Sequence, residues 1–159
     1  MAANAPAGAP RTPAPPQRLV RWAWGTLVGL LLESGLGVGL NVYSLSPSSP
    51  TFAKVFVSIP LLTAHIVLGF LLLVASGVFL LQARKSGVAG VPWRAALVVL
   101  FVLLAIQEGF SYTFTQNNAF SAGMVVGFLG AAVFQGMVVY QLRRAGPPTT
   151  GPQAPAGSP

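Results

Sequence analysis

The chain contains no cysteine and no aspartate, and its only acidic residues are Glu33 and Glu108. Without cysteine there is no disulfide, no thiolate metal site and no thiol redox chemistry. Without aspartate a Ser-His-Asp set is impossible, and no glycine-rich phosphate loop lies beside a strand. The sequence therefore gives no support to hydrolase, kinase or nucleotide chemistry. It favours a protein that is not an enzyme, without naming its role.

Charge is scarce as well. Only 7% of the 159 residues are charged and 53% are hydrophobic, whereas a soluble domain has about 25% charged residues. Residues 57–81 contain one ionisable side chain, His65, and exceed the roughly 20 apolar residues that an α-helix needs to cross a bilayer. Neither a helical nor a strand-like polar face is present in this stretch. We therefore predict an integral membrane protein in contact with the lipid bilayer.

Four apolar segments predict an all-α fold of four antiparallel transmembrane helices, packed as a bundle over residues 19–142. We expect the helices at residues 19–43, 57–81, 93–110 and 121–142. Pro60 falls in the first turns of the second predicted helix, where a missing N–H is least costly. Residues 1–18 and 143–159 are rich in alanine, proline and glycine. Such segments have too little apolar bulk to order, so we predict disordered tails.

The net charge of +7 has a simple explanation in topology. The nine Lys and Arg residues lie at the ends of the apolar segments, and eight of them fall on one predicted side, with Lys54 alone on the other. Cytoplasmic loops carry such an excess of basic residues. We therefore predict a multi-pass protein of the cell membrane with both termini cytoplasmic, and no nucleic-acid partner, because the charges do not form one basic face.

Small residues recur at every fourth position in two of the predicted helices and so form ridges. The first ridge comprises Gly25, Gly29, Glu33, Gly37 and Asn41, and the second comprises Gly123, Gly127, Ala131 and Gln135. Small residues let helices approach closely in lipid. Because a bundle needs at most one such ridge internally, our leading hypothesis is a non-enzymatic subunit that forms a homo-oligomer or joins a larger membrane complex.

The ionisable residues form a predicted polar cluster inside the membrane. Glu33 and His65 each lie eight residues from the outer end of their helix, which places both at a depth of about 12 Å. A charge at membrane depth costs on the order of 3 kcal/mol, so such groups usually face inward and pair. The shallower members of the cluster, nearer the outer boundary, are Glu108, Gln107 and Asn41.

Three interpretations of this cluster stay open. Glu33 and His65 satisfy each other and fix the register of two helices. Alternatively, the pair carries protons in step with a small solute, since histidine titrates near neutral pH. In the third interpretation His65 binds haem or a divalent metal in an electron-transfer protein. With one histidine in the chain, a haem would need a symmetric dimer or a second ligand such as Met124.

Overall fold

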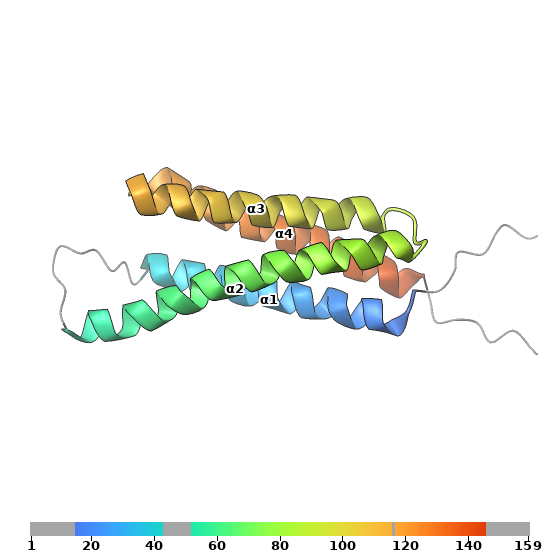
Figure 1. Ribbon diagram of the computed structural model, residues 1–159, viewed down its shortest axis with the longest axis horizontal. Helices are drawn as coiled ribbons and strands as arrows, with labels where there is room; N and C mark the ends of the chain where they lie inside the picture. The colour runs from blue at the N-terminus through green and yellow to red at the C-terminus, as the bar shows by residue number, and fades with distance from the viewer. Residues whose placement is uncertain (1–14, 43–51, 116, 146–159) are drawn as a thin grey trace, which may run out of the picture.

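The computed structural model describes residues 15–42, 52–115 and 117–145, and this part of the chain forms four α-helices (Figure 1). They are α1 (Gln17–Val42), α2 (Phe52–Lys85), α3 (Val91–Thr115) and α4 (Asn118–Arg144). Each is long and apolar enough to cross a membrane. The predicted all-α bundle of four membrane-spanning helices is therefore confirmed. Residues 1–14 and 146–159 of the two predicted tails lie outside the described residues.

All four helices begin before the predicted spans, and α2, α3 and α4 also end beyond them. The greatest differences are in α2, which begins at Phe52, and in α3, which ends at Thr115. Hydropathy detects the part of a helix that is matched to the hydrocarbon core, while the backbone hydrogen bonding continues into the polar flanks. Of the predicted link over residues 111–120, residues 111–115 therefore belong to α3 and residues 118–120 to α4. The Asn117 side chain caps α4 by accepting a hydrogen bond from the Ala119 N–H, at 3.0 Å.

The expected place of Pro60 was wrong. Because α2 begins at Phe52, Pro60 lies inside the helix and not in its first turns. Proline has no N–H to donate to the carbonyl four residues earlier. Membrane helices tolerate such positions because neighbouring groups satisfy the freed carbonyl.

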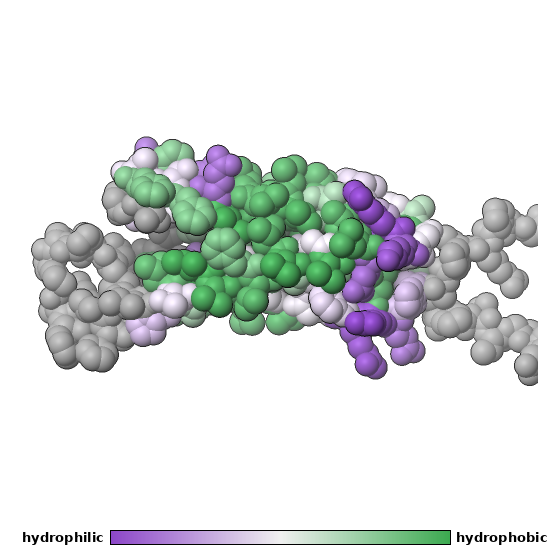
Figure 2. All heavy atoms as spheres, viewed as in Figure 1, coloured by the Kyte–Doolittle hydropathy of each residue, from purple (hydrophilic) through white to green (hydrophobic). Residues whose placement is uncertain are grey.

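The helices form a four-sided ring. In the described residues α1 contacts α2 and α4, and α3 contacts the same two helices, with the α3–α4 interface the most extensive. One buried cluster lies at the end of the bundle that holds Leu19, Phe79, Val88 and Leu142. A second cluster, around Leu72, Val102, Phe128 and Ala131, fills the middle. Large apolar side chains also cover the outside of the bundle (Figure 2), as expected for a surface that faces lipid.

The largest group of strongly hydrophilic residues lies at one end of the bundle (Figure 2), and we call the basic residues at this end the basic belt. This end holds the start of α1, the end of α2, the start of α3 and the end of α4 (Figure 1). The belt comprises Arg18, Arg21, Arg84, Lys85, Arg94, Arg143 and Arg144. Lys54 lies near the start of α2, at the opposite end.

Candidate functional site

Glu33 of α1 and His65 of α2 form a buried ion pair. The Oε1 atom of Glu33 lies 2.8 Å from Nδ1 of His65, and the two residues are only 1% and 7% exposed. The contact is close, but it does not meet the geometry of a hydrogen bond between the ring nitrogen and this oxygen. The two residues that share a predicted depth are thus in direct contact, and they join α1 to α2.

Two glycines make room for the pair. A Cβ atom at Gly37 would lie 3.3 Å from Cε1 of His65, and one at Gly69 would lie 3.2 Å from Oε1 of Glu33. Gly37 follows Glu33 by one helical turn, and Gly69 follows His65 by one turn. Each helix therefore carries an ionisable residue and, one turn later, a glycine that accommodates the ionisable residue of its neighbour.

Phe128 of α4 packs against the His65 ring of the pair. Its ring packs edge-on against the His65 ring, with the centroids 6.3 Å apart, and it is 3% exposed. An apolar surround of this kind strengthens the electrostatic attraction between the two groups. Sequence reasoning missed Phe128, because one phenylalanine beside Gly127 cannot be distinguished by pattern from the other phenylalanines of the chain.

The second carboxylate oxygen of Glu33 does not share the contact with His65. This atom, Oε2, is buried and has no hydrogen-bond partner among the described residues. Most buried polar atoms in folded proteins are hydrogen-bonded. An ionisable residue inside a membrane is a candidate functional group by default, and Glu33 combines one close contact to His65 with one oxygen that has no partner among the described residues.

The other members of the predicted polar cluster lie apart from the pair in the described contacts. Glu108 of α3 is partly buried and packs against α4, where a Cβ atom at Gly123 would lie 2.9 Å from its Oε2. Gln107 is exposed. Asn41 belongs to α1, but its side chain lies outside the described part. The described contacts therefore join two of the five residues.

Both small-residue ridges pack inside the bundle for most of their length. On α1, a Cβ atom at Gly29 would lie 2.7 Å from Leu72. On α4, a Cβ atom at Gly127 would lie 2.8 Å from that of Ala105 and 3.0 Å from its backbone, and Ala131 is fully buried. Gly25 differs, because no atom lies within 4 Å of the position of its Cβ. Contrary to expectation, neither ridge is left free for a partner over most of its length.

The α4 ridge also makes a polar contact with α1, through Gln135. The Gln135 side chain is fully buried and donates from Nε2 to the carbonyl oxygen of Ala23, at 2.9 Å. A hydrogen bond between membrane helices contributes roughly 1 kcal/mol. α1 is therefore held to α2 by the ion pair and to α4 by this hydrogen bond.

The structure offers few ligands for a metal or haem at His65. Within the described residues no three His, Cys, Asp or Glu side chains gather in one place. Met124, the expected second haem ligand, packs against α3, where its Sδ atom would lie 3.2 Å from a Cβ at Gly109. No described contact joins Met124 to His65. Glu33 is the one acidic side chain shown beside this histidine.

Comparison with known proteins gives no further guide to function. No family model matches the chain, and no match was found among curated proteins or solved structures.

Proposed function

We propose that the protein is a non-enzymatic membrane subunit, a preassembled four-helix unit in which the Glu33 and His65 pair fixes the register of α1 against α2. The observation that carries this proposal is the buried 2.8 Å contact between the two side chains. The reciprocal glycines, Gly37 and Gly69, support it because a Cβ atom at either position would make a tight contact with the ionisable side chain of the other helix. A pair so closely enclosed suits a fixed contact better than an open pathway.

Disulfide crosslinking tests the register directly, because the chain has no cysteine of its own. Gly29→Cys combined with Leu72→Cys places two thiols where α1 and α2 touch. Gly29→Cys combined with Leu68→Cys reports a register displaced by one turn. We expect the first combination to crosslink efficiently and the second poorly, and we expect Glu33→Gln to reduce this difference. An unchanged pattern in the Glu33→Gln background contradicts the proposal.

A proton-coupled carrier is the second candidate, and the unpartnered Oε2 atom of Glu33 favours it. In this alternative the carboxylate binds and releases a proton while His65 assists, in step with a small solute. The candidate predicts that Glu33→Gln abolishes flux driven by a pH gradient in proteoliposomes while the protein still folds. Flux that survives in Glu33→Gln excludes the candidate.

Haem or metal binding at His65 stays a hypothesis with a simple test. A ligating histidine commonly has a carboxylate beside its other ring nitrogen, and the Oε1 atom of Glu33 lies 2.8 Å from Nδ1 of His65. The hypothesis predicts a visible spectrum, or a stoichiometric metal, in the purified wild type that is lost in His65→Ala. A blank spectrum and a negative metal analysis of the wild type contradict it.

Self-association belongs to the same proposal, but on a different surface from the two ridges. Gly35 and Gly39 lie one turn apart on α1, and no atom lies within 4 Å of either Cβ position. Such a pair lets a second helix approach closely. A second copy of the chain at this surface predicts that Gly35→Leu converts dimers to monomers in native mass spectrometry. The control is Gly136→Leu, an isolated open glycine on α4, and a wild type that is monomeric in mild detergent contradicts self-association.

The orientation in the membrane is part of the proposal too. The basic belt supports placing both termini and the link between α2 and α3 in the cytoplasm of the cell. Reporter fusions at the C-terminus and at the link between α3 and α4 test this placement. We expect a cytoplasmic reporter to be active at the first site and inactive at the second, and the reverse result excludes the orientation.

A further inference from the structure

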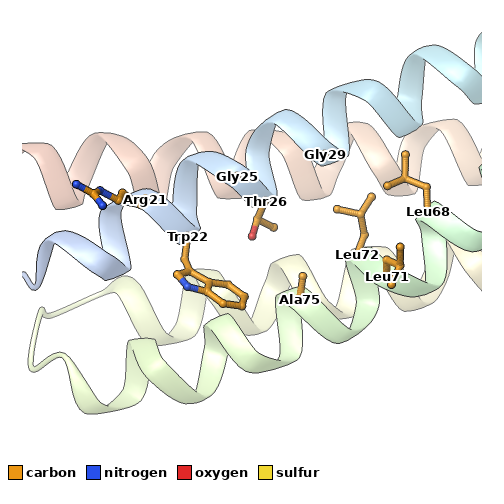
Figure 3. A pocket seen from close by; sticks show the side chains of 9 residues that line it. All are labelled: Arg21, Trp22, Gly25, Thr26, Gly29, Leu68, Leu71, Leu72 and Ala75. Atoms are coloured by element: carbon orange, nitrogen blue, oxygen red, sulfur yellow. The ribbon is translucent and has the colours of Figure 1, made fainter.

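An open groove lies between α1 and α2, in the half of the bundle that carries the basic belt (Figure 3). Its volume is about 480 Å³. Small residues of α1, among them Gly25 and Thr26, line one side, and Leu68, Leu71 and other apolar residues of α2 line the other. Arg21 and Trp22 lie at the end of the groove nearest the belt (Figure 3). The groove therefore has apolar walls and one charged end.

The groove exists because α1 and α2 touch at one level and separate at the next. At Gly29 a Cβ atom would lie 2.7 Å from the Leu72 side chain, whereas nothing lies within 4 Å of that position at Gly25. Gly25 is one turn nearer the belt. From Arg21 to Gly29 the groove follows α1 for about 12 Å, well within the roughly 30 Å hydrocarbon core.

The belt lacks acidic partners from its own chain. The two acidic side chains of the sequence are Glu33, which pairs with His65, and Glu108. Glu108 is separated from Arg94 by 14 positions of α3, which corresponds to about 21 Å along the helix. No glutamate is therefore available to neutralise the belt.

Arg21 is the basic residue that lines the groove. Arg94, Arg143 and Arg144 rest over aromatic rings at 5.2, 4.8 and 4.6 Å. Arg21 is exposed and, among the described residues, makes no hydrogen bond, ion pair or ring contact. Its guanidinium group is thus available to an anion at the mouth of the apolar groove.

We propose that this groove binds one acyl chain of an anionic phospholipid, whose phosphate lies at Arg21. Basic residues between membrane helices at the cytoplasmic side favour anionic headgroups, and Trp22 suits headgroup depth. A second copy of the chain is a poorer occupant of this groove, because its two acidic side chains, Glu33 and Glu108, lie away from the belt and supply no anion to Arg21. The inference does not depend on the role of Glu33 and His65.

Native mass spectrometry of the full chain, with equal amounts of dioleoyl-phosphatidylglycerol and dioleoyl-phosphatidylcholine in the detergent, tests the charged end. We expect the wild type to retain the anionic lipid preferentially. Arg21→Gln should lower that preference about fivefold, the effect of one basic residue near anionic lipid. Arg84→Gln, a belt residue that does not line the groove, is the matched control and should lower it by less.

The apolar walls are tested by filling the groove. Gly25→Leu should lower retention of both lipids, and Gly136→Leu, at an open glycine on α4, should not. Ala75→Leu fills the groove from α2 and replaces Gly25→Leu if that variant does not fold.

Four results overturn the inference. The first is equal retention of both lipids by the wild type, and the second is retention that neither groove-filling variant changes. The third is complete displacement of the lipid by soluble glycerol phosphate, which would make this a site for phosphate alone. The fourth is a wild-type dimer that Gly25→Leu dissociates, which would assign the groove to a second copy.

Discussion

The α3–α4 interface and the α1–α2 interface are built on different principles. Between α3 and α4, glycines bring the helices into backbone contact, with a Cβ position at Gly127 only 3.0 Å from the backbone of Ala105. Between α1 and α2 there is an ion pair at one level and an open groove at another. Close packing stabilises membrane helices all along an interface, whereas a single pair stabilises one point. The difference suggests that α3 and α4 form the rigid half, and that the α1–α2 contact depends on a few polar atoms.

The largest expected effect comes from removing one member of the pair. His65→Leu leaves the Glu33 carboxylate buried without its partner, which costs about 3 kcal/mol when a buried pair is broken on one side. Reversible unfolding in mixed detergent micelles, followed by circular dichroism, measures the change. Ala64→Leu, an exposed neighbour on α2, is the control and should change the stability little. Equal stability of both variants would show that the pair does not hold α1 to α2.

The next effect tests the close packing of α3 against α4. Gly127→Ala adds a methyl group against the Ala105 backbone, which cannot turn aside, so we expect a loss of about 2 kcal/mol from overpacking. The same unfolding assay applies. Gly136→Ala, with open space around its Cβ position, should be neutral or slightly stabilising because alanine favours helix. A loss at both positions would mean that helix geometry, and not the α3–α4 contact, is responsible.

A smaller effect is expected at the contact between α4 and α1. Gln135→Leu removes the hydrogen bond to the Ala23 carbonyl, and we expect a loss of about 1 kcal/mol. Met137→Leu, at an exposed position two residues away, provides the reference. If Gln135→Leu stabilises the protein, the hydrogen bond does not compensate for burying the amide.

The smallest effect makes the comparison between the two interfaces sharpest. Gly29→Ala also introduces a close contact, but with the terminal methyl group of Leu72, a flexible side chain beside the groove. We expect Leu72 to move and the net change to stay within about 0.5 kcal/mol, since alanine also favours the helix. A loss in Gly29→Ala as large as that in Gly127→Ala would indicate that the two interfaces are equally rigid.

Much of the fold could be predicted from the sequence because membrane insertion imposes strong rules. The apolar run over residues 57–81 and the sparse charge predict the four spans. The helix ends could not be predicted in the same way, because α2 continues well beyond the apolar run in both directions. Hydropathy reports the thickness of the hydrocarbon core and not the last backbone hydrogen bond.

Depth along the helices predicts which ionisable groups share a level, and Glu33 and His65 are in contact as expected from their equal distance to the outer boundary. The rotation of each helix about its own axis is harder to predict from one sequence. Phe128, Leu72 and the carbonyl of Ala23 each take part through the packing of a neighbouring helix. The groove beside Gly25 depends on how far two helices separate, and no residue pattern encodes that distance.

The measurement that most directly tests the central claim is a double-mutant cycle on the pair, using Glu33→Gln, His65→Asn and the double variant. Unfolding free energies of the four proteins give the coupling between the two side chains. We expect a coupling of about 1 kcal/mol or more, the upper range for polar contacts between membrane helices. If the two single effects simply add, the contact between Glu33 and His65 does not stabilise the bundle. The proposal that this pair fixes the register of α1 against α2 is then wrong.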